Sequence, residues 1–183
     1  MDLQASDRIL ELGCGDGWAC RALAERIPEG LVIGLDQSDD QIRDARTKSM
    51  AFDNLLYLWS AAEQIPWQED FFTRVVCVDS LLQFQDLEKV LRESYRVLAP
   101  GGTLWIVDQR VVEDENQRND PSSRPAGASL LNVEPDLTLL YKTGFEDIAP
   151  HSPPNPAMHL KTSVNDLSSP AAVLVLSGRK RQE

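Results

Sequence analysis

Short apolar runs alternate along the chain with segments whose apolar residues recur at the helical period. The apolar runs have strand length and cover residues 8–12, 31–35, 55–59, 75–78 and 103–107. Segments with the helical period follow the first two of these runs, at residues 18–26 and 39–50. This alternation predicts βαβ units, in which helices cover both faces of a parallel sheet. The runs are almost wholly apolar, as expected of strands buried on both sides, so the pattern predicts a doubly wound α/β fold.

Local signals predict where two of the helices begin and where one ends. Ser38, followed by Gln41 three residues later, matches a capping box, and Asp86 can cap a further helix. Pro100-Gly101-Gly102 ends that helix, because proline cannot continue it and glycine accepts a tight return. The stripe of this helix that we expect to face inward comprises Leu87, Val90, Leu91, Ser94, Tyr95 and Leu98.

The pattern changes after Asp108. Two stretches, near residues 111–129 and 150–170, are rich in polar residues and proline without an apolar period, which predicts mobile surface loops. A short helix ending near Thr143 lies between them, and an extended segment follows it at residues 145–149.

A strong strand at residues 172–177 completes the pattern. The last two predicted strands follow a helix, so we expect them to form an antiparallel edge on the parallel sheet. There is no internal repeat, and 183 residues fit one domain, so we expect a single domain over residues 1–183.

Charge and composition narrow the classes of partner. Eighteen Lys and Arg against 29 Asp and Glu give a net charge of −11, which repels phosphate backbones and anionic lipid headgroups. We therefore expect no nucleic-acid and no membrane partner, and no apolar run reaches the ~20 residues of a membrane helix. The N-terminus lacks the features of a secretion signal. Cys14, Cys20 and Cys77 show no CxxC spacing, which predicts reduced thiols in a cytoplasmic protein and no metal site.

Residues 9–18, Ile-Leu-Glu-Leu-Gly-Cys-Gly-Asp-Gly-Trp, predict a strand that runs into a glycine-rich turn and opens a helix. Such a turn brings a ligand against bare backbone. A dinucleotide fingerprint, GxGxxG, would need glycine at Trp18, whereas the spacing here is GxGxG, which disfavours a nicotinamide cofactor. Asp16 would compete with a pyrophosphate for the helix N-terminus. Together, Glu11, Asp16 and Asp36 favour a cationic ligand such as a sulfonium.

Asp36 ends the second predicted strand, 19 residues past Gly17. In a doubly wound fold, a carboxylate at this place accepts hydrogen bonds from the hydroxyls of a ribose. The alternative is that Asp36 caps the following turn, which Ser38 and Asp39 can do without it. We favour the ribose role, and expect Asp36→Ala to weaken binding at least tenfold with little effect on the melting temperature.

Four motifs, in this order and spacing, resemble class I S-adenosylmethionine-dependent methyltransferases, most of all the small-molecule branch (type 11) of ubiquinone and menaquinone biosynthesis. They are residues 11–17, 34–36, 62–67 and 96–104. The resemblance implies a Rossmann-like seven-stranded sheet, mostly parallel with an antiparallel edge strand. It also implies transfer of a methyl group from S-adenosylmethionine to a small-molecule acceptor by in-line displacement.

The resemblance further implies roles for single residues. The glycine turn would surround the methionyl part of the cofactor, Asp36 would bind its ribose, and Ala61, Ala62 and their neighbours would surround its adenine. The full set expected to bind the cofactor is Glu11, Gly13, Cys14, Gly15, Gly17, Asp36, Gln37, Ala61, Ala62 and Asp79.

The chain departs from the family pattern at two places. Ser60-Ala61-Ala62-Glu63 stands where the family has Gly-Asp-Ala-Glu, so the aspartate that bonds the adenine amine is missing at Ala61, a loss of about 1 kcal/mol. The first strand begins about seven residues from Met1, whereas the family carries N-terminal helices that close over the site. The site is therefore open, or is covered by the two long loops or by another subunit of a homo-oligomer, unless the chain is trimmed from a longer one.

Methyl transfer from a sulfonium mainly needs the nucleophile, methyl carbon and leaving sulfur held in line, and needs a general base only for an unionised acceptor. The acceptor should lie beyond the fourth and fifth strands, so the candidate catalytic residues are Asp79, Gln83 and Asp108. Both aspartates can equally be cap or turn residues. His151 and His159 lie in a proline-rich loop without a spaced partner. Nothing in the sequence identifies the acceptor.

Two other functions stay open. One is a non-catalytic methyltransferase-like binding module, which the missing lid and Ala61 motivate. The other is an NAD-dependent oxidoreductase, which the glycine spacing and Asp16 disfavour.

Overall fold

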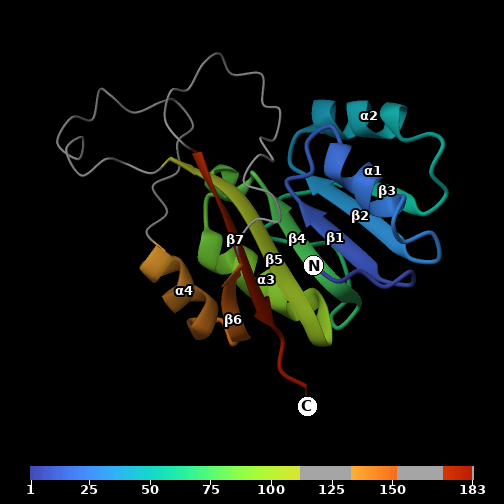
Figure 1. Ribbon diagram of the computed structural model, residues 1–183. Helices are drawn as coiled ribbons and strands as arrows, with labels where there is room; N and C mark the ends of the chain where they lie inside the picture. Colours follow the sequence, from blue (N-terminus) through green and yellow to red (C-terminus); the bar gives the residue numbers. More distant parts are fainter. Residues whose placement is uncertain (112–132, 152–170, 183) are drawn as a thin grey trace, which may run out of the picture.

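Seven strands form one sheet in the order β3-β2-β1-β4-β5-β7-β6 within the described part of the computed structural model, which covers residues 1–111, 133–151 and 171–182 (Figure 1). The strands are β1 (Arg8–Leu12), β2 (Leu31–Asp36), β3 (Leu55–Trp59), β4 (Phe72–Val78), β5 (Leu98–Val111), β6 (Glu146–His151) and β7 (Ala171–Arg179). The helices are α1 (Trp18–Ala24), α2 (Asp39–Lys48), α3 (Leu87–Val97) and α4 (Val133–Lys142), with a 3-10 turn η1 (Leu81–Gln83).

The predicted fold class is confirmed. Strands β1 to β5 pair in parallel, and β7 runs antiparallel to both β5 and β6. The antiparallel strand therefore lies one position in from the edge of the sheet. Figure 1 shows the β7 arrow pointing opposite to that of β5.

Helices cover both faces of the sheet because successive strand residues point to opposite sides. On one face, Ile9 and Val32 pack with residues of α1 and α2. On the other face, Leu10 and Ile33 pack with residues of α3 and α4. The alternation along the central strands thus builds two apolar layers, and it leaves the carboxyl ends of the strands as the place for a ligand.

Both predicted helix caps are present. The Ser38 hydroxyl accepts from Gln41 N at 3.4 Å, and the Asp86 carboxylate accepts from Lys89 N at 3.0 Å. The predicted end of α3 was too late, because the helix stops at Val97 and Leu98 already begins β5.

The second half of the chain differs from the sequence prediction at His151. His151 was expected in a loop without a partner, but it ends β6, where its ring nitrogen lies 2.7 Å from the Ser177 hydroxyl and its ring stacks on Trp105. The expected loops near 111–129 and 150–170 lie almost wholly outside the described residues, as does His159. No helix among the described residues is both long and apolar enough to cross a membrane.

Candidate functional site

The turn after β1 is tied to the neighbouring strand. The backbone N–H groups of Gly13 and Cys14 both donate to the Leu35 carbonyl, at 2.8 and 3.0 Å. Gly17 ends the turn with a φ of 78°, and a Cβ there would lie 2.2 Å from the Tyr57 hydroxyl oxygen. Only glycine fits this position, so the sequence GxGxG follows from the close approach of Tyr57 and from the backbone conformation.

Asp36 lies at the end of β2 and its carboxylate is held by the turn. Gly15 N donates to Oδ2 at 2.9 Å, and Ser38 N donates to Oδ1 at 2.8 Å. The residue is only 6% exposed. Because each carboxylate oxygen has two acceptor sites, both oxygens keep capacity for a further donor. The structure therefore contains a fixed acceptor at the place where the sequence predicts a ribose-binding group.

A small cleft, with an enclosed volume of about 10 Å³, lies beside Asp36. The described residues that line it are Gly13, Leu35, Asp36, Gln37, Ala62, Glu63, Gln83 and Phe84. These residues follow or end strands β1 to β4, so the cleft lies at the carboxyl ends of the parallel strands. Here the chain crosses from one side of β1 to the other, which is where open α/β sheets bind ligands.

The structure brings only part of the predicted cofactor set to this cleft. Four of those residues line it, namely Gly13, Asp36, Gln37 and Ala62. Six others are not among the lining residues, namely Glu11, Cys14, Gly15, Gly17, Ala61 and Asp79. Among them, Gly15 contributes through its hydrogen bond to Asp36.

Glu11 is buried beneath the turn on the α1 side of the sheet. The Cys20 thiol donates to its Oε2 at 2.7 Å, and burial raises the pKa of Cys20 further, which keeps this donor protonated. Desolvation raises the pKa of Glu11 to about 7, since a buried carboxylate loses its hydration. Glu11 is thus a core carboxyl rather than a fixed negative charge on the cleft.

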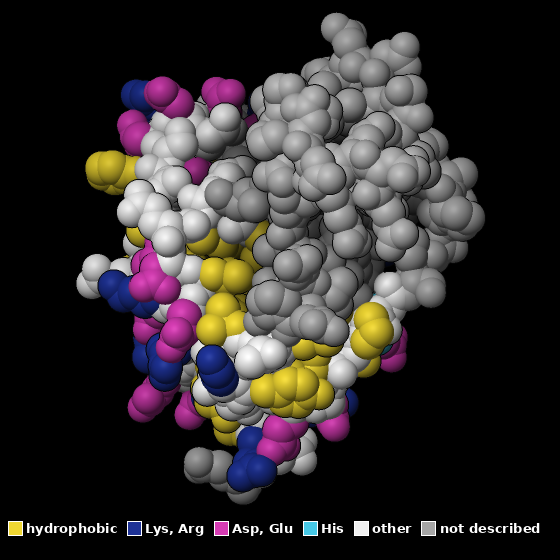
Figure 2. Space-filling view, turned by 90° about the vertical axis from the view of Figure 1, so that its left-hand side faces the viewer, with side chains coloured by type: hydrophobic (Ala, Val, Ile, Leu, Met, Phe, Trp, Pro, Cys, Tyr) yellow, Lys and Arg dark blue, Asp and Glu magenta, His cyan; other side chains and the backbone are white. Residues whose placement is uncertain are grey.

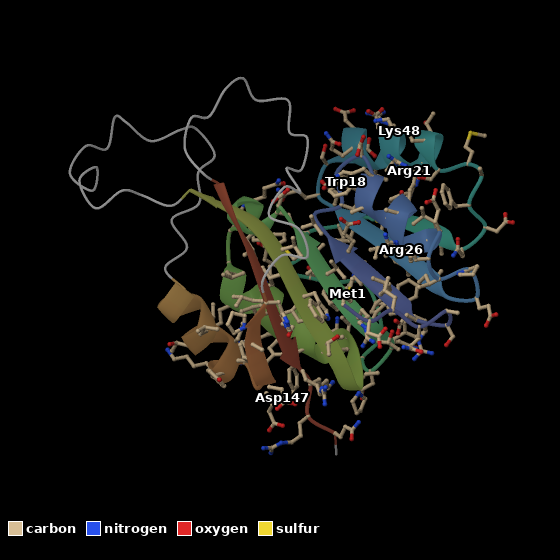
Figure 3. All side chains as sticks on the ribbon, viewed as in Figure 1. Met1, Trp18, Arg21, Arg26, Lys48 and Asp147 are labelled. Atoms are coloured by element: carbon tan, nitrogen blue, oxygen red, sulfur yellow. The ribbon has the colours of Figure 1, made fainter. Side chains whose placement is uncertain are left out.

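Asp16 is paired with a lysine of the next helix. Lys48 Nζ lies 2.7 Å from its Oδ2, and this hydrogen bond is the main reason why the pKa of Asp16 is lowered. Arg21 donates to the Asp16 carbonyl at 2.8 Å, and Figure 3 shows Arg21 of α1 and Lys48 of α2 near Trp18. The Asp16 carboxylate is therefore ionised and paired with Lys48, and its predicted part in favouring a cationic ligand stays a prediction.

The three candidate catalytic residues differ in position. Gln83 ends η1 and lines the cleft. Asp79 directly follows β4 with a φ of 49°, and its backbone N–H donates to the Val107 carbonyl at 2.9 Å. Asp108 lies on the adjacent strand β5, opposite Leu174 of β7; its side chain is outside the description. Of the three, Gln83 alone is placed at the cleft by a described side chain.

The comparison with known families agrees with this arrangement. The model of a family described as a methyltransferase domain matches residues 10–106, which span β1 to β5. The chain belongs to the class I S-adenosylmethionine-dependent methyltransferase family.

Curated methyltransferases are similar to this family member over part of their length. The sterol 24-C-methyltransferase of Saccharomyces cerevisiae is 31% identical over 156 residues, which are 79% of this chain and 40% of the yeast protein. The demethylmenaquinone methyltransferase of Listeria welshimeri is 34% identical over 111 residues, 59% of this chain and 47% of that protein. The chain thus spans less than half the length of these two relatives.

Solved structures of other proteins share the fold. YcgJ from Bacillus subtilis superposes with a TM-score of 0.70 at 20% identity, covering 100% of this chain and 95% of that one. Phosphoethanolamine N-methyltransferase 2 of Haemonchus contortus gives a TM-score of 0.76 at 20% identity, over 99% of this chain and 50% of that one. The latter structure contains S-adenosylhomocysteine and phosphomonomethylethanolamine. At these identities the likeness shows the fold alone.

Sequence reasoning missed some residues that line the cleft. Leu35, Glu63 and Phe84 line it but were not proposed as site residues. Glu63 belongs to a quoted motif, so its position carried a signal that was not used. Ser80 was also missed: its hydroxyl donates to the Leu12 carbonyl at 2.7 Å, and its Cβ would lie 2.6 Å from a Cβ at Gly13. No spacing in the sequence indicates this contact, which depends on β4 lying beside β1.

Proposed function

We propose that the protein is an S-adenosylmethionine-dependent methyltransferase that acts on a small-molecule acceptor. One observation carries the proposal: the Asp36 carboxylate is fixed by Gly15 N and Ser38 N beside an open cleft, at the end of β2. The Haemonchus methyltransferase contains S-adenosylhomocysteine, the demethylated product of this cofactor, within a similar fold. When bound, the cofactor supplies a methyl group that its sulfonium has already activated.

Different residues around the cleft bind different parts of this cofactor. The glycine turn, from Gly13 to Gly17, presents bare backbone to the methionyl part. Asp36 accepts hydrogen bonds from the ribose hydroxyls, each of which contributes roughly 1.5–3 kcal/mol when the acceptor is charged. Gln37 and Ala62 stand on the walls of the cleft and face the base. Glu11 and Cys14 support the turn from below.

The main catalytic contribution of the protein is positioning. Holding the acceptor in line with the reacting methyl group can contribute ~7–11 kcal/mol, since an encounter of two molecules becomes a reaction within one complex. Gln83, on the cleft, is placed to orient the acceptor. Asp79 and Asp108 follow or lie on the adjacent strands β4 and β5, and either can serve as general base for an unionised acceptor.

The test is a calorimetric titration with S-adenosylmethionine, S-adenosylhomocysteine and NAD. We expect both sulfur ligands to bind, and at 100 times Kd to stabilise the fold by ~2.7 kcal/mol, which appears as a rise in melting temperature. Binding of NAD alone would instead indicate an oxidoreductase. No binding of the sulfur ligands at millimolar concentration would contradict the proposal.

Binding without chemistry would leave the non-catalytic module as the better description. Mass spectrometry separates the two. An enzyme converts S-adenosylmethionine to S-adenosylhomocysteine only when a pool of small-molecule acceptors is added, and methylated products gain one methyl mass. A binding module forms no product from any such pool.

A further inference from the structure

The buried hydroxyl of Ser80 joins two segments that border the cleft. Ser80 is only 1% exposed, and its Oγ donates to the carbonyl of Leu12, the last residue of β1, at 2.7 Å. We propose that Ser80 is a positioning residue that holds the glycine turn and Gln83 at a fixed separation. This inference rests on the proposed function, in which the turn binds the methyl donor and Gln83 orients the acceptor.

Ser80 contacts both of the parts that it would position. Leu12 directly precedes the glycine turn, and a Cβ at Gly13 would lie 2.6 Å from the Ser80 Cβ, so the first residue of the turn packs against this side chain. On the other side, the Ser80 carbonyl accepts from Gln83 N at 3.0 Å, which begins the η1 turn. A shift of Ser80 therefore moves both borders of the cleft.

The surroundings of the hydroxyl fix its direction. Cys77 Sγ lies 3.0 Å from Ser80 Oγ, on the side of β4. A hydroxyl has one proton and two lone pairs, so Ser80 can donate to Leu12 and accept from the Cys77 thiol at the same time. The preceding residue, Asp79, donates its N–H to the Val107 carbonyl of β5 at 2.9 Å. The backbone of this segment is thus tied to β5, and the Ser80 side chain ties it to β1.

This tie matters for the rate of methyl transfer more than for binding of the cofactor. The two segments follow different strands, β1 and β4, so contacts between them set the distance from donor to acceptor. A misplacement of about 1 Å can lower the rate of a positioned reaction on the order of 100-fold. The groups that we propose bind the cofactor directly stay in place when only the Ser80 hydroxyl is removed.

The first experiment separates rate from affinity in Ser80→Ala. Product formation from a pool of small-molecule acceptors is followed by mass spectrometry at saturating S-adenosylmethionine, and S-adenosylhomocysteine is titrated calorimetrically. We expect the rate to fall at least about tenfold, while Kd for S-adenosylhomocysteine changes less than about threefold.

Ser94→Ala is a matched control. Ser94 is 0% exposed and its hydroxyl donates to the Val90 carbonyl at 2.8 Å, but it lies within α3 and does not line the cleft. It loses the same buried group and keeps the wild-type rate and Kd. Ser80→Cys retains a weak donor, so it shows a smaller loss of rate and serves if Ser80→Ala does not fold.

The second experiment measures the tie without catalysis. Amide hydrogen exchange is followed by NMR with and without S-adenosylhomocysteine. In the wild type and in Ser94→Ala, we expect the ligand to slow exchange at Gly13, Cys14 and Gln83, because the turn and Gln83 move together. In Ser80→Ala the ligand slows exchange at Gly13 and Cys14 but not at Gln83.

The outcomes distinguish the inference from the proposed function. An unchanged rate in folded Ser80→Ala overturns the inference, as does a loss of affinity equal to the loss of rate. Wild-type protection of Gln83 in Ser80→Ala overturns it as well, and this measurement decides alone if the wild type binds the ligand but forms no product. A wild type that binds no sulfur ligand refutes the proposed function, and the inference with it.

Discussion

At the scale of single residues, Asp36 fixes the turn beside the cleft, and it is the residue that we propose binds the ribose. Its carboxylate accepts from Gly15 N and Ser38 N, so it stabilises the backbone beside the cleft before a ligand binds. The sequence predicted the position of this acid but not these two contacts. Because of these contacts, we expect Asp36→Ala to destabilise the empty protein. The sequence alone suggested that the melting temperature would change little.

Asp36→Ala should therefore have two effects. Affinity for S-adenosylhomocysteine falls at least tenfold, because the ribose loses its acceptor, and the free energy of unfolding falls by about 1–3 kcal/mol, because two N–H groups lose theirs. Calorimetric titration and urea unfolding measure the two effects. Asp40→Ala, an exposed acid on α2, serves as the control and changes neither by much. Wild-type affinity in Asp36→Ala would remove this residue from the site.

Glu11 makes stability depend on pH in the direction opposite to that of a salt-bridged acid. Its pKa rises from 4.5 to about 7 on folding, because burial penalises the carboxylate. Between these values the folded protein holds a proton that the unfolded chain has released. Stability from this group is therefore lost as pH rises from 4.5 to 7, by up to about 3 kcal/mol.

Glu11→Gln should remove that slope, because the amide does not titrate. Urea unfolding from pH 5 to 8 should show that the variant gains stability relative to the wild type as pH rises. Glu29→Gln, an exposed acid, should follow the wild-type curve. Parallel curves for wild type and Glu11→Gln would show that Glu11 is ionised throughout in the folded state.

At the scale of elements, local sequence signals predicted where helices begin, whereas contacts between distant segments could not be predicted from the sequence. The caps Ser38 and Asp86 act within one turn, so the sequence contains all that is needed to place them. Strand β5 extends from Leu98 to Val111, well beyond its apolar run, because it pairs with β7 over residues far along the chain. The contribution of Glu63 to the cleft likewise depends on where the turn before α3 lies.

The glycine turn offers a matched pair of substitutions. Gly15 and Gly17 both have positive φ, at 53° and 78°, but a Cβ at Gly15 meets only the Gln41 side chain at 3.7 Å, whereas one at Gly17 meets Tyr57 at 2.2 Å. Gly15→Ala should lower the free energy of unfolding by roughly 1–2 kcal/mol, because alanine is strained in the left-handed conformation. Gly17→Ala adds a clash with the buried Tyr57 ring, so it should lower the free energy of unfolding clearly more. Thermal unfolding of both variants tests this, and equal losses would mean that Tyr57 does not constrain the turn.

At the scale of the whole molecule, the sheet order places the site. The alternating runs predicted helices on both faces of the sheet. Neither the hydrophobic period nor the composition indicates that β1 lies between β2 and β4. This strand order brings Gly13, Asp36 and Gln83 to one cleft. The net charge of −11 is not gathered on the described part of the face in Figure 2, where acidic and basic side chains are interspersed.

Above all, we propose that the sugar of a sulfur-containing nucleoside binds to Asp36, beside the glycine turn. A crystal structure of the protein with S-adenosylhomocysteine tests it most directly. We predict both ribose hydroxyls within about 3 Å of the Asp36 carboxylate oxygens, with the homocysteine part along Gly13 to Gly17. A ligand bound elsewhere, or a cleft filled by the protein's own side chains at saturating ligand, would contradict the account.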